Sequence, residues 1–223
     1  MRGRRVELRP LRRSDADGLD ALLRDRPATR WLPPRVRTET GARFVRRVLR
    51  ADGRGEGVSF AICPIPTDEA VGQIRLFHRS PVERSAEVGY FLRRSSWGQG
   101  FATDALRLAC RYGFGELGLH RIQAKVIPGN EASRKVLENV GFVLEGTQRK
   151  STRIAGRWLD VWEFGLVRGE LRSRRPGNRK KIEMRPRPRV HRPGARARTR
   201  RSRSDRRAPL RPRPEGRPVH PQR

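Results

Sequence analysis

Two glycines spaced two residues apart lie where a strand pattern gives way to a helix pattern. The segment is Tyr90-Phe91-Leu92-Arg93-Arg94-Ser95-Ser96-Trp97-Gly98-Gln99-Gly100-Phe101-Ala102-Thr103. Glycines in such a turn let backbone N–H groups approach a ligand, and the start of the following helix adds about half a positive charge. The turn is therefore suited to an anion such as a diphosphate; alternatively, it only starts a helix and binds nothing.

Two other phosphate-binding motifs do not fit this turn. It lacks the Gly-Lys-Ser/Thr end of a nucleotide P-loop, and it is not a G-x-G-x-x-G dinucleotide motif. A second polar turn follows about thirty residues later, again between a strand pattern and a helix pattern: Pro128-Gly129-Asn130-Glu131-Ala132-Ser133-Arg134-Lys135-Val136-Leu137-Glu138-Asn139-Val140-Gly141-Phe142. The two turns together are more specific than either one alone.

The two segments resemble the GCN5-related N-acetyltransferase (GNAT) superfamily, and more closely its bacterial ribosomal-protein N-terminal acetyltransferases of the RimJ/RimL type. The resemblance rests on Trp97 to Ala105, Leu119-His120-Arg121-Ile122, Asn130-x-x-Ser133 and Leu137-x-x-x-Gly141-Phe142, with support from Leu8-Arg9-Pro10, Asp15, Ala86 to Tyr90 and Trp158-x-Asp160. It extends over about residues 5–170, and it implies a single α/β domain in which helices flank a mixed sheet.

The resemblance also implies a donor, acetyl-CoA, whose acetyl group passes to a primary amine. In this family the backbone amides of Gly98, Gln99, Gly100, Phe101, Ala102 and Thr103 would hold the pyrophosphate. The backbone of Phe91 and Leu92 would bond the pantetheine arm and polarise the thioester carbonyl, and Asn130 would contact the cofactor or its bound water. No metal is implied.

Attack of an amine on a thioester needs an N–H donor for the oxyanion, a proton acceptor and a proton donor for the thiolate. Other N-terminal acetyltransferases place a tyrosine acid where this chain has Leu137, and some relatives have an acidic residue where it has Lys125. We therefore predict that Ser133 replaces the acid, either as the proton donor or as a hydrogen bond to the CoA sulfur, and that Glu87, acting through a water, is the base. The alternatives are a helix-capping hydroxyl for Ser133 and a solvated carboxylate for Glu87.

Three further polar residues have an ordinary structural explanation beside a functional one. Cys110 lies within a helix pattern and is expected in the core, because a free cysteine is commonly buried. His120 precedes a strand and is expected to be a structural histidine. Asp160 lies between two tryptophans, where it either forms hydrogen bonds or meets a substrate amine.

The acceptor follows from the strength of the base. Freeing the lone pair of a lysine side chain (pKa near 10.4) costs roughly 3–4 kcal/mol more at neutral pH than freeing that of an α-amine (pKa near 7.7–8.0). A weak, water-mediated base therefore suits the N-terminal α-amine of a protein, and the resemblance points to a ribosomal protein. The alternatives are acetylation of a small-molecule amine, such as an antibiotic or polyamine, and a non-enzymatic RNA-binding protein.

The elements that must position these residues follow from hydrophobic periodicity. Strands are predicted at 6–9, 58–62, 71–77, 86–92, 121–126, 142–145 and 158–167, the second and third forming a hairpin. Helices are predicted from about residue 14 to residue 27, around residues 44–49, from residue 101 to about residue 113, and over 132–140. This order gives a mixed sheet with helices on its faces.

Charge and aromatic residues divide the chain unevenly. Of the net charge of +30, +18 falls on residues 172–223, which contain none of the 14 Phe, Trp and Tyr. Such a segment cannot form a core and is predicted to be a disordered basic tail. It either contacts RNA, near the ribosome, through phosphates or is a solvated extension. With two cysteines and no apolar run near the roughly 20 residues that span a bilayer, we expect a soluble, cytoplasmic protein with no membrane partner.

Overall fold

The structure, a computed structural model, describes residues 1–172. The predicted basic tail, and any RNA contact through it, lies outside these residues. In chain order the elements are β1 (Val6–Pro10), η1 (Arg13–Asp15), α1 (Ala16–Arg24), α2 (Arg26–Thr29), α3 (Pro34–Arg37), α4 (Gly41–Gly53), β2 (Gly57–Pro64), β3 (Gly72–Ser80), β4 (Ser85–Leu92), η2 (Arg94–Ser96), α5 (Phe101–Gly115), β5 (Arg121–Val126), α6 (Glu131–Val140), β6 (Val143–Ile154) and β7 (Arg157–Val167).

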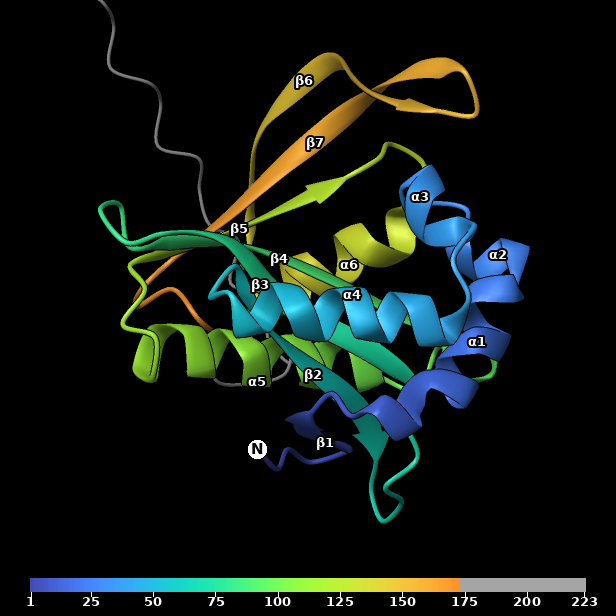
Figure 1. Cartoon of the computed structure of the whole chain (residues 1–223). Helices are drawn as coiled ribbons and strands as arrows, with labels where there is room; N and C mark the ends of the chain where they lie inside the picture. Colours follow the sequence, from blue (N-terminus) through green and yellow to red (C-terminus); the bar gives the residue numbers. More distant parts are fainter. Residues whose placement is uncertain (173–223) are drawn as a thin grey trace, which may run out of the picture. The chain divides into compact units, whose positions relative to one another are not determined.

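The strands form one sheet in the order β1-β2-β3-β4-β5-β7-β6 (Figure 1). All neighbouring pairs are antiparallel except β4 and β5, which run parallel. The predicted mixed sheet with flanking helices is therefore confirmed. The parallel pair is the one interruption of the antiparallel pattern, and it lies in the middle of the sheet.

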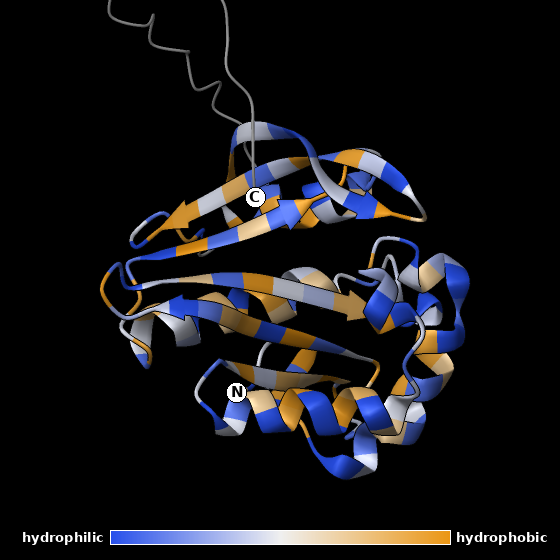
Figure 2. Cartoon of the chain, turned by 45° about the horizontal axis from the view of Figure 1, so that its top comes forward, coloured by the Kyte–Doolittle hydropathy of each residue, from blue (hydrophilic) through white to orange (hydrophobic). Residues whose placement is uncertain are grey.

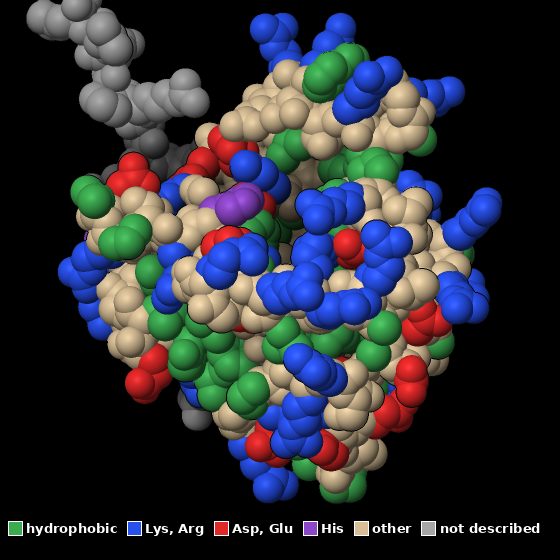
Figure 3. Space-filling model, in the orientation of Figure 1, with side chains coloured by type: hydrophobic (Ala, Val, Ile, Leu, Met, Phe, Trp, Pro, Cys, Tyr) green, Lys and Arg blue, Asp and Glu red, His purple; other side chains and the backbone are tan. Residues whose placement is uncertain are grey.

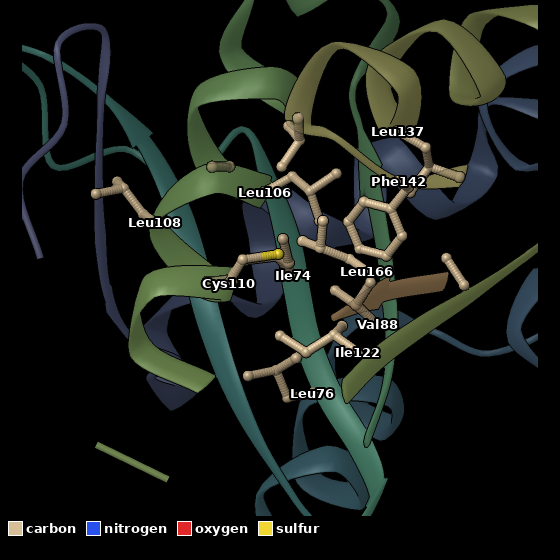
Figure 4. Packing of buried hydrophobic residues seen from close by; sticks show 14 of the residues in the cluster. Ile74, Leu76, Val88, Leu106, Leu108, Cys110, Ile122, Leu137, Phe142 and Leu166 are labelled. Atoms are coloured by element: carbon tan, nitrogen blue, oxygen red, sulfur yellow. The ribbon is translucent and has the colours of Figure 1, made fainter. Parts of the chain in front are cut away.

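A core lies on each face of the sheet. Beneath α5 and α6, strand side chains at alternate positions, including Ile74, Val88 and Ile122, pack against Leu106 and Leu137 (Figure 4). On the opposite face, α1 and α4 bury a smaller cluster. Figure 2 shows the apolar stripes of these helices turned toward the sheet. Cys110 is fully buried in the first core, as predicted, and burial raises the pKa of its thiol.

An ion pair joins β1 to the first helices. The Arg9 guanidinium donates to both oxygens of Asp15, at 2.9 and 2.7 Å. Burial of the Asp15 carboxylate would raise its pKa, but the hydrogen bonds from Arg9 and from the backbone N–H of Arg12 outweigh burial and lower it. The Leu8-Arg9-Pro10 motif and Asp15 are thus explained by a structural pair that fixes where α1 begins.

Two regions differ from the elements that the sequence predicts. The predicted strand over 142–145 is much longer, because β6 continues to Ile154 and forms a long hairpin with β7. Two short helices that the sequence analysis did not predict, α2 and α3, lie between α1 and α4 and are joined by residues 30–33. Among the described residues, no helix has the length and apolar character needed to cross a membrane.

Candidate active site

The site begins where β4 and β5 separate. The two strands pair only from Ser85 to Glu87 on β4, opposite Arg121 to Gln123 on β5. Beyond this point β4 continues to Leu92 beside β3, while β5 continues beside β7. The later residues of β4 therefore present backbone groups to an open gap instead of to a neighbouring strand.

The register of β4 decides which residues face the gap. The Arg93 N–H donates to the Val71 carbonyl at 2.9 Å, which turns the backbone of Arg93 toward β3. Since backbone direction alternates along an antiparallel strand, Phe91 also faces β3, whereas Tyr90 and Leu92 face the gap. The sequence analysis assigned the backbone of both Phe91 and Leu92 to the ligand. In this register the backbone groups of Tyr90 and Leu92 face the gap and those of Phe91 face β3, while the Phe91 ring packs edge-on against Phe44 with ring centres 5.5 Å apart.

The glycine turn between η2 and α5 has the predicted form. Gly98 and Gly100 have φ angles of +73° and +77°, in the left-handed region that favours glycine. The first backbone bond of the helix runs from the Asp104 N–H to the Gly100 carbonyl at 3.1 Å. The amides of residues 101–103 precede this bond, so they lie at the helix end as donors for an anion.

Side chains around the turn hold it in place. The Trp97 indole N–H donates to the Leu92 carbonyl at 2.9 Å, and the Gln99 side chain donates to the Ser95 carbonyl at 2.9 Å. The carboxylate of Asp104 accepts the backbone N–H of Arg5 at 2.8 Å. The one acidic side chain in the first turn of α5 is thus bonded to the start of β1 instead of facing the ligand.

A pocket of about 460 Å³ joins the turn to the gap. Its lining includes eight of the nine predicted cofactor-binding residues, namely Phe91, Leu92, Gly98, Gly100, Phe101, Ala102, Thr103 and Asn130, and also the predicted acid Ser133. Gln99 is not among the lining residues. The charged side chains of the lining are Arg30 and Lys135, and no carboxylate is among them. A positive pocket with free amide donors fits the polyphosphate part of coenzyme A.

The segment between α2 and α3 covers one side of this pocket and was not predicted as part of the site. Trp31 lies against Gly129, where an added Cβ would be 3.3 Å from the edge of the indole ring. The Arg30 guanidinium is 4.8 Å from the centre of the same ring. The sequence showed only a tryptophan before two prolines, so nothing local pointed to a contact with a turn almost one hundred residues later.

Ser133 forms a hydroxyl pair with a second side chain in the pocket. Its Oγ is 3.0 Å from the phenolic oxygen of Tyr90, which also donates to the Ser133 carbonyl at 3.3 Å. Burial raises the pKa of Tyr90 far above its usual value, outweighing the hydrogen bond with Ser133 that lowers it. Tyr90 is therefore a neutral phenol at neutral pH. Asn130 positions Ser133 from the other side, since its Oδ1 accepts the Ser133 N–H at 3.3 Å.

Glu87 lies outside the pocket lining, on the face of β4 opposite to Tyr90. Its carboxylate is 3.4 Å from the Lys125 ammonium and 3.7 Å from His78 Nδ1, and its side chain is only 13% exposed. The structure therefore does not bring the two predicted catalytic residues together. Glu87 belongs to the last residue pair before the two strands separate. On the α4 side of the molecule, Figure 3 shows a hollow below the β6–β7 hairpin, with Lys and Arg side chains along its rim.

The remaining polar candidates take structural positions. The backbone N–H of His120 donates to the Arg84 carbonyl at 2.6 Å, and its carbonyl accepts the Arg168 N–H at 2.8 Å, while its side chain is exposed. Asp160 accepts the backbone N–H of Lys150 at 2.8 Å, so it forms the hydrogen-bonded alternative of its two predicted roles.

Comparison with known proteins identifies the class. Residues 5–143 match the family model described as an acetyltransferase (GNAT) domain, so the chain belongs to the GNAT acetyltransferases. It is 33% identical over 168 residues to the uncharacterized N-acetyltransferase p20 of Bacillus licheniformis, covering 74% of this chain and 94% of that protein. The Mycobacterium smegmatis RimJ structure, in complex with CoA-disulfide, matches with a TM-score of 0.65 and 29% identity, over 76% of this chain and 88% of that one. The predicted family and RimJ/RimL likeness are thereby confirmed.

Two relatives with named substrates also match, over shorter stretches. The ribosomal-protein-serine acetyltransferase of Escherichia coli is 31% identical over 94 residues, 42% of this chain and 52% of that protein. The spermidine N(1)-acetyltransferase of Vibrio cholerae is 30% identical over 104 residues, 47% of this chain and 60% of that protein. The chain is thus an N-acetyltransferase with relatives that act on both kinds of amine.

Proposed function

We propose that this N-acetyltransferase uses acetyl-CoA to acetylate the N-terminal α-amine of a protein, with a ribosomal protein as the nearest model. The observation that supports this acceptor is the distribution of charge. The pocket lining has two cations and no carboxylate, and the Glu87 carboxylate is already beside Lys125. A polycationic amine would need free carboxylates near the reacting centre, whereas a single α-amine near its own pKa does not.

In this proposal, residues on one face of β4 bind acetyl-CoA, and Glu87 on the other face receives the proton of the amine. Acetyl-CoA, when bound, supplies an acetyl group on a good thiolate leaving group. The amides of residues 98–103, with Arg30 and Lys135, hold the phosphates, and the backbone N–H groups of Tyr90 and Leu92 are available to polarise the thioester carbonyl. These contacts orient the thioester toward the face on which Glu87 lies.

Two proton transfers complete the reaction. As the amine nitrogen bonds to the acetyl carbon, Glu87 takes its proton through a water molecule. As the carbon–sulfur bond breaks, Ser133 gives a proton to the thiolate, and Tyr90 replaces that proton through the 3.0 Å contact between the two hydroxyls. After the products leave, solvent water returns a proton to Tyr90 and takes the proton from Glu87, which restores the starting state. The base and the acid therefore act on opposite sides of β4.

The acceptor can be tested with three substrates at equal concentration. One is a lysine-free peptide with a free α-amine; the second is the same peptide with a blocked α-amine and one added lysine; the third is spermidine. Release of the CoA thiol should be at least about tenfold faster, as kcat/KM, with the first. Faster release with spermidine would favour the small-molecule alternative, and faster release with the lysine peptide would place the acceptor on side chains.

A further inference from the structure

The outer part of the β6–β7 hairpin projects beyond the rest of the sheet. β5 pairs with β7 only from Trp162 to Val167, and β6 forms the edge of the sheet with β7 as its partner. From Val161 outward, therefore, the two strands pair only with each other (Figure 1). None of the residues of this extension lines the cofactor pocket.

A tryptophan is exposed on this extension. Trp158 is 60% exposed, the most exposed aromatic side chain among residues 1–172. It pairs across the hairpin with Arg153, whose side chain bends to the Gly156 carbonyl at 3.3 Å. An indole has about the area of a nucleobase, and exposing it to water is unfavourable unless a partner covers it.

Four cations lie in the hairpin tip near the tryptophan: Arg153 is its cross-strand partner, and Arg157, the preceding residue, lies on the opposite face. Arg149, Lys150, Arg153 and Arg157 are all exposed, and none forms a salt bridge within the described part of the chain. Two carboxylates lie nearby, each with a neutral donor: Asp160 accepts the backbone N–H of Lys150 at 2.8 Å, and Glu163 accepts the Gln148 amide at 2.8 Å. Even with both counted, the four cations leave the tip with a net positive charge. Figure 3 shows Lys and Arg side chains projecting around a hydrophobic group over this hairpin.

We infer that the hairpin tip, residues 149–158, binds single-stranded RNA, with a base stacked on Trp158 and phosphates beside the four cations. A second copy of the chain is disfavoured, because four unpaired cations on each copy would meet like charges. An acidic peptide would form ion pairs with the cations, but it has few aromatic groups that could stack on the indole of Trp158. Every nucleotide has both a phosphate and a base with a π face. An exposed indole beside several cations therefore suits single-stranded RNA of any sequence.

The test must separate the hairpin from the basic residues 172–223, whose net charge of +18 would attract any polyanion. Fluorescence anisotropy of the full chain is measured with a labelled oligouridylate of about twelve nucleotides and with an abasic strand of the same charge. Trp158→Ala should weaken oligouridylate binding about tenfold and leave the abasic strand unaffected, because it removes stacking only. Val82→Ala, an exposed apolar residue in the β3–β4 turn, is the matched control and should change neither.

The contribution of the hairpin cations to RNA binding is tested with two triple variants that remove the same charge. Replacing Arg149, Arg153 and Arg157 by alanine should flatten the slope of log affinity against log salt by about 2, since each lost phosphate contact contributes about 0.7. Replacing the exposed Arg43, Arg46 and Arg50 of α4 removes the same charge and should change the slope much less. Equal effects of the two triple variants, or no effect of Trp158→Ala, would overturn the proposal. So would hairpin-dependent binding of an oligoglutamate peptide tighter than that of the RNA.

Discussion

The two faces of β4 hold their polar side chains in different ways. On the α5–α6 face, Tyr90 and Ser133 are neutral hydroxyls bonded to each other in a pocket that has positive charge and no carboxylate. On the α4 face, Glu87 is a carboxylate between Lys125 and His78. One strand thus separates the proposed proton donor from the proposed proton acceptor. In the proposed mechanism the substrates meet at the gap that opens where β4 and β5 stop pairing after Glu87.

The largest expected effect is on the cofactor side of this comparison. Gly100→Glu places a carboxylate at the amide donors and forces a side chain onto a backbone with φ of +77°. Strain and lost anion contacts of about 4 kcal/mol correspond to roughly a thousandfold weaker binding of acetyl-CoA. Isothermal titration calorimetry with acetyl-CoA measures this directly.

Two controls separate the causes. Gly100→Ala introduces the backbone strain without the carboxylate, and it should weaken acetyl-CoA binding only about tenfold. Gly53→Glu, where an added Cβ meets nothing within 4 Å, should leave binding unchanged. Normal acetyl-CoA binding by Gly100→Glu would remove the glycine turn from the site.

Local sequence predicted the elements that carry the candidate cofactor site, because each of them is made from consecutive residues. The glycine turn and the start of α5 follow from residues within a few positions of one another, whereas the cap that Asn130 forms on α6 was not predicted. Alternating apolar residues within a short segment likewise predicted the strands that bury one face. This signal failed for β6, which is exposed on both faces over most of its length and so has no alternating pattern.

Contacts between distant segments were beyond local prediction. The Tyr90–Ser133 pair joins residues 43 positions apart and depends on how α6 packs against β4. Trp31 reaches Gly129 only after α2 and α3 fold over the gap. Likewise, the assignment of Glu87 and Ser133 to opposite faces requires the strand register, which the residue types alone do not contain.

The hydroxyl pair should show the next largest effect. Ser133→Ala removes the proton donor to the thiolate and should lower kcat about a hundredfold, with little change in the KM for acetyl-CoA. Tyr90→Phe should lower kcat about tenfold. If the two act in series, the double variant should be no slower than Ser133→Ala, so that a double-mutant cycle gives a large coupling energy. Independent, multiplying losses would show that Tyr90 serves packing only.

The ion pair between Arg9 and Asp15 should affect the stability of the fold and leave the rate of acetyl transfer unchanged. Asp15→Asn leaves the half-buried Arg9 with only the exposed Asp68 as a charged partner, so we expect the free energy of unfolding to fall by about 2 kcal/mol. Because the pKa of Asp15 is lowered in the folded state, its contribution is complete above the ordinary value near 4 and is lost as pH falls through the lowered one. Urea unfolding at neutral and acidic pH measures both effects.

The control here is Asp17→Asn, an exposed carboxylate in the same helix turn, which should change the unfolding free energy by a few tenths of a kcal/mol. A difference between the wild type and Asp15→Asn that stays constant down to about pH 2 would contradict the lowered pKa.

The smallest expected effect concerns the base. Glu87→Gln preserves the shape of the side chain but removes the proton acceptor, so kcat/KM for the acceptor amine should fall about tenfold at neutral pH while acetyl-CoA affinity stays unchanged. Raising the pH should restore most of the loss, because more of the α-amine is then already deprotonated. Glu83→Gln, in the exposed turn before β4, is the matched control. A loss that persists at high pH would mean that Glu87 orders Lys125 and His78 and accepts no proton, and the α4 face would then need another base.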